Sequence, residues 1–204
     1  MKECWIFGSG EITDYSAYKV PADAYIIAAD GGFRHIKRLG LVPDLLLGDF
    51  DSLTDEMPKN CRIMTVPAEK DDTDMMLAVK TALSEGYENI ILCGGLGGRL
   101  DHTIANIQTL EYIAKHNGNG MIFSERNTIL LQQKGCRSYK KQEGAYFSLF
   151  ALAETAEVTT RGTKYNLTNY KLTRDFPLGV SNEIVEDNAD VEVKSGILLV
   201  LFSK

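Results

Sequence analysis

The first half of the 204-residue chain alternates short apolar runs with segments of helical spacing, and this alternation constrains the fold more than any other feature. Such a succession is typical of a parallel sheet covered by helices. We expect strands at the apolar runs, which are 4–7, 25–29, 45–47, 62–66 and 89–93. We expect helices between them, over 32–39, 73–84 and 101–116.

After about residue 120 the pattern changes to short strand-like runs separated by turn residues. These runs are MIFSE, TILLQQ, YFSLFAL, AEVTT, YNLTNYKL, DVEVKS and ILLVLF. Their density is typical of a β-sandwich or barrel. The sequence therefore predicts an α/β domain with a parallel, Rossmann-like sheet over residues 1–126, followed by a small all-β sandwich domain over 127–204.

Negative charge is concentrated in the first half of the chain. Residues 1–102 contain 17 acidic and 10 basic residues, whereas the second half is close to neutral. An acidic surface repels a phosphate backbone, so we do not expect a nucleic-acid partner. A divalent cation or a cationic substrate fits this surface better.

The sequence gives no sign of a membrane span or a secretory leader. No stretch approaches the ~20 apolar residues that a bilayer requires, so we expect a cytoplasmic protein without a membrane partner. The four cysteines lack metal-ligand spacing, and we interpret them as buried thiols. His35 and His116 lie among charged residues of expected helices, and we expect both at the surface.

Carboxylates and glycines follow several of the expected strands. Ligands of open parallel sheets bind beyond the carboxyl ends of the strands, so these positions are the first candidates for a site. The segments concerned are Asp30-Gly31-Gly32, Gly48-Asp49-Phe50-Asp51, Asp71-Asp72-Thr73-Asp74 and Gly94–His102. Turns and helix caps also favour such residues, so no single segment is decisive.

Asp49 and Asp51 are the most informative of these carboxylates. Alternate residues of an extended segment point to the same side, and two neighbouring carboxylates repel each other. A hard cation such as Mg²⁺ removes that repulsion. A DxD pair after a strand also occurs in phosphatases with an aspartate nucleophile, which leaves that class as an alternative.

Four glycines lie within five positions over 94–98, and Arg99 follows them. Such a loop suits an approach of backbone N–H groups to an anion, with Arg99 as a further donor. Gly8-Ser9-Gly10 lacks the third glycine of a dinucleotide-binding motif, so it is weak evidence for a nucleotide site.

Six segments in this order together resemble the thiamine diphosphokinases, also called thiamine pyrophosphokinases. The matching segments are AADGG at 28–32, PDLLLGDFDS at 43–52, DDTD at 71–74, GGRLDH at 97–102, GTKYNLTN at 162–169 and GVSNE at 179–183. The resemblance implies transfer of pyrophosphate from ATP to the hydroxyl of thiamine, giving thiamine diphosphate and AMP. It also implies Mg²⁺ and a homodimer with thiamine bound near the subunit interface.

The resemblance assigns roles to individual residues. It implies a catalytic group consisting of Asp49, Asp51, Asp74, Arg99 and Asp101, of which the first three hold the metal. For the nucleotide it implies contacts from Asp30, Gly31, Asp72, Thr73, Gly97, Gly98, Arg99 and His102. For thiamine it implies Tyr165, Ser181 and Asn182, with Tyr165 at a position where the family often has tryptophan.

Two functions outside this family stay open at the level of sequence. One is an aspartate-nucleophile phosphatase, and the other is a non-catalytic sensor that binds Mg-nucleotide at the same acidic edge. A sensor would bind the nucleotide without turning it over, and a phosphatase would release phosphate without an acceptor.

Overall fold

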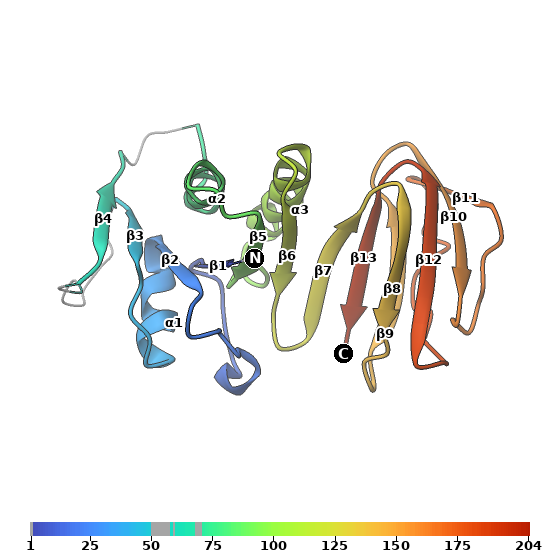
Figure 1. Cartoon of the computed structure of the whole chain (residues 1–204), viewed down its shortest axis with the longest axis horizontal. Helices are drawn as coiled ribbons and strands as arrows, with labels where there is room; N and C mark the ends of the chain where they lie inside the picture. The colour runs from blue at the N-terminus through green and yellow to red at the C-terminus, as the bar shows by residue number, and fades with distance from the viewer. Residues whose placement is uncertain (1, 50–57, 59, 68–70) are drawn as a thin grey trace. The chain divides into compact units, whose positions relative to one another are not determined.

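The chain divides into two compact units, Met1–Glu125 and Arg126–Lys204, each with its own secondary structure. The computed structural model describes residues 2–49, 58, 60–67 and 71–204 of the chain (Figure 1). Each unit is described by itself below.

The first unit contains a parallel sheet. Its strands are β1 (Glu3–Phe7), β2 (Tyr25–Ala29), β3 (Leu45–Gly48), β4 (Arg62–Thr65), β5 (Asn89–Cys93) and β6 (Asn119–Phe123). They are ordered β4-β3-β2-β1-β5-β6, and each neighbouring pair runs parallel. The expected Rossmann-like sheet is confirmed.

In the described part of the first unit, three α-helices cover this sheet. They are α1 (Phe33–Arg38), α2 (Asp74–Ser84) and α3 (Leu100–Lys115). Helix α1 lies on one face of the sheet, and α2 and α3 lie on the opposite face (Figure 1). Helix α2 begins where the Thr73 side chain accepts a hydrogen bond from the Met76 backbone N–H at 3.1 Å, which satisfies one of the unpaired donors of the first turn.

The strand order reverses between β1 and β5. From β1 the chain builds the sheet outward through β2 and β3 to β4, and then returns to place β5 on the other side of β1. The connections that leave β1 and β5 therefore diverge to opposite sides, which opens a crevice at the carboxyl ends of these strands. The fold thus determines where a ligand can enter the sheet edge.

The second unit is antiparallel. Its strands are β7 (Asn127–Gln132), β8 (Gly135–Lys140), β9 (Tyr146–Ala151), β10 (Thr155–Arg161), β11 (Tyr170–Thr173), β12 (Asn188–Ser195) and β13 (Leu198–Ser203). One layer has the order β7-β13-β9 and the other β11-β10-β12-β8. Buried residues of both layers, among them Phe147, Val158, Val191 and Val200, form one core, which confirms the expected β-sandwich.

Three expectations from the sequence were wrong, two in the second unit and one in the first. The strand β8 was not anticipated, because its residues are mostly exposed and give no apolar run. The run YNLTNYKL is a strand only from Tyr170 onward, so Tyr165 lies in a loop. His35 is buried, with 3% of its surface exposed, because hydrogen bonds to other parts of the chain satisfy both of its ring nitrogens.

The cysteines also depart in part from the expectation. Cys4 and Cys93 are buried, where desolvation raises the pKa of each thiol far above its usual range, but Cys61 is half-buried and Cys136 is exposed. Cys136 lies on β8, whose surface position the sequence did not reveal. All four thiols are free. In the part of the chain that the structure describes, no helix is long and apolar enough to span a bilayer.

We predict that Gly32→Ala destabilises the first unit far more than Gly31→Ala. A Cβ at Gly32 would lie 1.8 Å from the Phe7 backbone oxygen, so the main chain at the end of β1 would have to move. A Cβ at Gly31 would meet the Ser9 Cβ at 3.2 Å, a contact that a displacement of a few tenths of an ångström relieves. Chemical denaturation should give a loss of at least about 2 kcal/mol for Gly32→Ala and under about 1 kcal/mol for Gly31→Ala. Equal losses would contradict the close packing of Gly32 on β1.

Candidate active site

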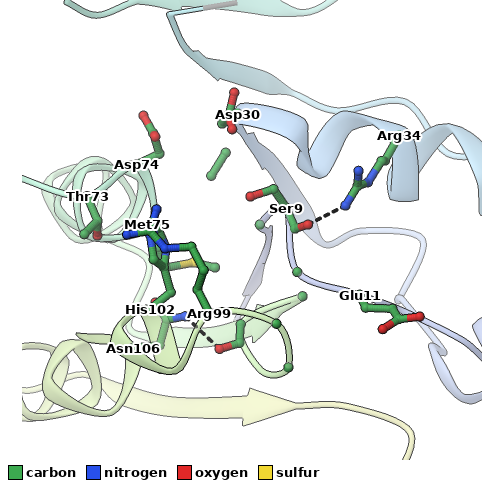
Figure 2. Close-up of a pocket in the computed structure, with 17 residues that line it drawn as sticks. Ser9, Glu11, Asp30, Arg34, Thr73, Asp74, Met75, Arg99, His102 and Asn106 are labelled. Carbon is green, nitrogen blue, oxygen red and sulfur yellow. Dashed lines mark hydrogen bonds between the residues drawn. The ribbon is translucent and has the colours of Figure 1, made fainter. Parts of the chain in front are cut away.

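A cleft of about 470 Å³ opens at the carboxyl ends of β1, β2 and β5, where the strand order reverses. Its walls come from the segments that follow these strands, from the first turns of α1 and α2 and from the first two turns of α3 (Figure 2). The lining residues are Gly8, Ser9, Gly10, Glu11, Ala29, Asp30, Arg34, Thr73, Asp74, Met75, Gly94, Gly95, Gly97, Gly98, Arg99, His102 and Asn106. The cleft therefore joins four separate stretches of the sequence, within 8–11, 29–34, 73–75 and 94–106.

Two carboxylates predicted from the sequence line the cleft together. Asp30 follows β2 and adopts a left-handed backbone conformation with φ of 52°, which Asp tolerates better than most residues. Asp74 is the first residue of α2, where the positive end of the helix dipole favours a carboxylate. Figure 2 shows both side chains near the upper edge of the view, above Arg99 and His102. Carboxylate oxygens are the ligands that a hard cation such as Mg²⁺ prefers.

Glycine-rich turns form the floor of the cleft. Gly97 and Gly98 have φ angles of 81° and 69°, a backbone conformation that favours glycine. The buried Asn106 on α3 donates a hydrogen bond of 2.8 Å to the Gly95 carbonyl and so ties the loop after β5 to the helix. The loop therefore presents bare backbone to the cleft while its start is held in place.

Arg99 lines the cleft, but its charge is already engaged. Its guanidinium donates to the two carboxylate oxygens of Asp101 at 3.1 and 2.5 Å, and the pair is well exposed to solvent. Hydrogen bonds from Arg99 and from the His102 backbone hold the pKa of Asp101 below its usual range. Asp101 itself does not line the cleft, so its interaction with Arg99 orients the guanidinium rather than adding a carboxylate to the wall.

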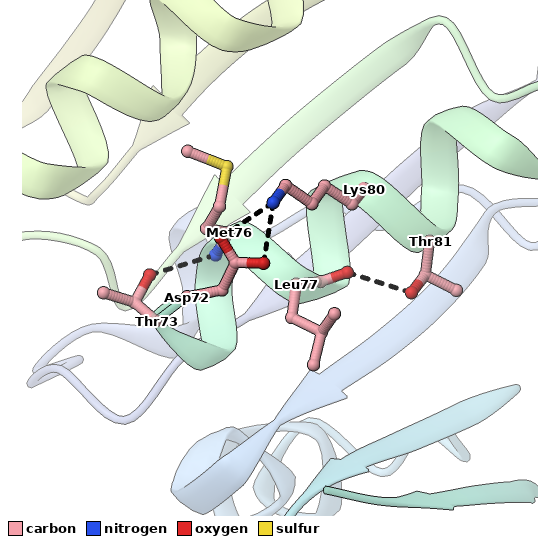
Figure 3. A network of polar contacts seen from close by, with 6 residues as sticks. All are labelled: Asp72, Thr73, Met76, Leu77, Lys80 and Thr81. Carbon is pink, nitrogen blue, oxygen red and sulfur yellow. Dashed lines mark hydrogen bonds and ion pairs between the residues drawn. The ribbon is translucent and has the colours of Figure 1, made fainter. Parts of the chain in front are cut away.

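Asp72 is held outside the cleft by a lysine on α2. The Lys80 ammonium donates to both carboxylate oxygens of Asp72 at 2.8 and 2.7 Å, as Figure 3 shows. The Lys80 ammonium also lies 5.7 Å from the centre of the Tyr112 ring. This interaction fixes the segment just before Thr73 and Asp74, both of which line the cleft. The structure therefore assigns Asp72 an anchoring contact that its sequence position did not indicate.

The other residues of the first unit that were predicted for the site either do not line the cleft or lie outside the described residues. Asp49 is half-buried directly after β3, at the same edge of the sheet but not in the lining of the cleft, and Gly31 is also outside the lining. Asp51 lies outside the described residues. Among the residues described, no three His, Cys, Asp or Glu side chains come together as a complete metal cluster. Mg²⁺ needs only one or two carboxylates when water and phosphate supply the remaining ligands, so Asp30 and Asp74 are compatible with this ion.

The three residues predicted for thiamine lie together in the second unit. Asn182 is 9% exposed, and its side chain accepts a hydrogen bond from the Tyr165 N–H at 3.0 Å and donates one to the Tyr165 carbonyl at 2.8 Å. This contact fixes the backbone of Tyr165, a residue that is 63% exposed. Ser181 has a left-handed φ of 58°, and its N–H donates to the Ser148 hydroxyl at 3.0 Å.

Sequence reasoning missed several residues of the cleft. Gly8, Ser9 and Gly10 form part of its wall although they lack a complete dinucleotide-binding motif. Their position directly after the first strand was the available signal, since strand ends at a change in strand order bind ligands. Arg34 and Asn106 gave no such signal, because each lies within a helix.

Comparisons with known proteins agree with this two-part architecture. Residues 19–122 match the family model "Thiamin pyrophosphokinase, catalytic domain", and residues 136–198 match "Thiamin pyrophosphokinase, vitamin B1 binding domain". Thiamine pyrophosphokinase of Bacillus subtilis is 32% identical over 184 residues, which cover 87% of this chain and 86% of that protein.

Solved structures show the same relationship. The crystal structure of thiamine pyrophosphokinase from Bacillus subtilis matches with a TM-score of 0.91 and 29% identity, over 100% of this chain and 99% of the other. That from Geobacillus thermodenitrificans matches with a TM-score of 0.87 and 28% identity, over 99% and 97% of the two chains. The resemblance inferred from the six sequence segments is confirmed, and the comparisons support neither the phosphatase nor the sensor. The chain belongs to the thiamin pyrophosphokinase family.

Proposed function

We propose that the cleft of the first unit is where this chain binds ATP for the transfer of pyrophosphate to thiamine that characterises its family. One observation carries this proposal. Two glycine-rich turns and the carboxylates of Asp30 and Asp74 line one cleft where the strand order reverses, the position at which open α/β sheets bind nucleotides. Backbone N–H groups of the glycine-rich turns can bind the phosphates, and the carboxylates can bind the cation that accompanies ATP.

In this reaction the hydroxyl oxygen of thiamine attacks the β-phosphorus of ATP. The bond from that phosphorus to the oxygen bridging to the α-phosphate breaks, and AMP leaves with the bonding electrons. Such transfers require mainly in-line positioning and neutralisation of charge. We infer that Arg99, oriented by Asp101, faces the charge that develops on the departing α-phosphate.

The hydroxyl proton requires an acceptor or leaves to water late in the reaction. Asp101 is a poor acceptor, because Arg99 holds its pKa low and its carboxylate lies outside the lining of the cleft. Asp74 lines the cleft at the start of α2 and is our candidate for this role.

We infer that Mg²⁺ would be held by Asp74 and by the Asp49 and Asp51 pair that follows β3, with Asp30 as a further carboxylate at the same edge of the sheet. When bound there with ATP, the ion supplies charge neutralisation across the phosphates. Asp30, Thr73, Gly97, Gly98 and His102 complete the wall around the nucleotide. Gly31 and Asp72 support this wall from outside, the first next to Asp30 and the second through Lys80.

Thiamine binding is assigned to the second unit. The Tyr165 ring offers a π-face to the thiazolium cation or the aminopyrimidine, and Asn182 holds its backbone in place. Ser181, the exposed residue directly before Asn182, belongs to the same segment. We further propose a cytoplasmic homodimer, consistent with the exposed apolar side chains of Tyr146, Phe176 and Val185 on this unit.

The reaction itself is tested by measuring AMP. We expect the purified protein with Mg-ATP to release AMP only when thiamine is added, with thiamine diphosphate formed in equal amount. Release of inorganic phosphate without thiamine would instead indicate a phosphatase. Binding of Mg-ATP with no AMP under either condition would indicate a sensor.

The carboxylate of Asp74 is predicted to be essential for turnover. Asp74→Asn should lower kcat by at least about 100-fold, the scale of losing one charge-stabilising group, and should raise the Mg²⁺ concentration needed for half-maximal rate. Asp23→Asn, which changes an exposed carboxylate outside the cleft, is the matched control and should leave both quantities unchanged. Near-normal kcat in Asp74→Asn would exclude Asp74 from the site.

Tyr165 is predicted to contribute to thiamine binding alone. Tyr165→Ala should raise the KM for thiamine about 2- to 5-fold, the loss expected for one exposed cation–π contact, while the KM for ATP stays constant. Tyr165→Trp should preserve or lower the KM for thiamine because it keeps the π-face. Tyr170→Ala removes another exposed tyrosine and serves as the control. An equal rise in both KM values would contradict a stacking role.

A further inference from the structure

The loop Gly8–Gly10 is packed closely against the turn that follows β5. The Gly8 and Gly10 N–H groups donate to the carbonyls of Cys93 and Gly94 at 2.8 and 2.9 Å. A Cβ on Gly10 would lie only 2.3 Å from the Gly94 oxygen. On this side the loop therefore has no freedom to move toward β5.

Helix α1 holds the opposite side of the same loop. The His35 Nε2 lies 2.8 Å from the Gly10 carbonyl oxygen, and the Arg34 guanidinium donates to the Ser9 carbonyl (Figure 2). Gly8, Ser9, Gly10 and Arg34 line the cleft, whereas His35 does not. His35 therefore contacts the back of the wall rather than the space that a nucleotide would fill.

The partners of His35 define which ring nitrogen carries the proton. Nε2 has the Gly10 carbonyl at 2.8 Å and the Arg34 Nε at 3.5 Å. The nearer partner, the carbonyl, is only an acceptor, so Nε2 donates to it, and in the neutral ring Nδ1 must accept. The Tyr15 hydroxyl lies 2.6 Å from Nδ1 and donates to it. Burial lowers the pKa of His35, and the neighbouring charges of Arg34 and Arg38 act in the same direction, which favours the neutral ring.

Tyr15 is itself fixed by its surroundings. The Arg38 guanidinium lies 4.7 Å from the centre of its ring, and Tyr18 packs beside it with ring centres 6.5 Å apart. A chain of contacts therefore runs from Arg38 through Tyr15 and His35 to the Gly10 backbone in the wall of the cleft. Tyr15 and His35 are each held by at least two other residues.

We propose that His35 is a positioning residue that holds the Gly8–Gly10 wall of the cleft in the conformation that binds the phosphates of ATP. The proposal rests on the proposed function, since it assigns ATP to this cleft. Without the Nε2 donor the Gly10 carbonyl loses its side-chain partner, and the wall can move away from the nucleotide. Displacements of about 1 Å at such a wall are enough to weaken binding and turnover.

Two substitutions at this position separate positioning from packing. The amide nitrogen of His35→Gln can reach the place of Nε2 and donate to Gly10, whereas the shorter side chain of His35→Asn cannot. We expect the KM for ATP and the dissociation constant for Mg-ATP to rise about tenfold in His35→Asn, the scale of losing one buried hydrogen bond, and less than about threefold in His35→Gln. The KM for thiamine should stay constant in both.

Tyr15→Phe provides an independent variant that leaves the imidazole in place. It removes the donor to Nδ1 and should raise the dissociation constant for Mg-ATP while the KM for thiamine is unchanged. Thermal unfolding of all three variants measures the structural effect separately. Equal nucleotide affinity in His35→Asn and His35→Gln, or unchanged affinity in both despite a lower Tm, would overturn the proposal and leave His35 a packing residue.

Different results would contradict the proposed function and the positioning role of His35. If the wild-type protein formed no AMP with thiamine, the proposed function would fall, and direct binding of Mg-ATP would still test His35. If AMP forms as expected but the His35 variants bind Mg-ATP equally well, only the positioning role is wrong.

Discussion

The close approach of two backbone turns, after β1 and after β5, is the constraint on which the cleft depends. Glycine is required where they meet, because a side chain at Gly10 or Gly94 would collide with a backbone oxygen of the facing turn. Hydrogen bonds from the Gly8 and Gly10 N–H groups then join the two turns. The floor and one wall of the cleft are therefore a single braced unit, and the divergence of the chain on either side of it creates the space for a ligand.

The carboxylates in the first half of the chain take two kinds of position in the fold. Some carboxylates serve the scaffold: Asp72 binds Lys80, Asp101 binds Arg99, and the Asp44 side chain accepts a hydrogen bond from the Ile26 N–H. Asp30 and Asp74 instead line the cleft. The anchored carboxylates hold the segments from which the cleft carboxylates project. Part of the negative charge that indicated a cation site therefore holds the segments that carry the site, and only part of it lines the cleft.

Prediction from the sequence succeeded where one local signal decided the structure. The buried strands β2 and β5 are continuous apolar runs, and the bounds expected for both agree with the structure. It failed where a residue's role depends on distant partners. His35 has charged neighbours in sequence and looks like a surface residue, yet Gly10 and Tyr15, 25 and 20 positions away, make it a buried contact. For the same reason Asp72 was predicted to contact the nucleotide, although its ion pair with Lys80 holds it outside the lining of the cleft.

The sequence by itself determined the α/β and β-sandwich architecture, the acidic edge with its glycine-rich loops, and membership of the family. The architecture and the acidic edge follow from periodicity and from the residue types at strand ends, both of which are local, whereas membership of the family follows from the six matching segments. Only the tertiary structure decided that Gly8–Gly10 and Arg34 join the cleft, that Asp101 and Asp72 stay out of its lining, and that Asn182 holds the backbone of Tyr165. The physical reason is that hydrogen bonds and steric contacts act over a few ångströms in space, and the order of strands in the sheet determines which distant segments come within that range.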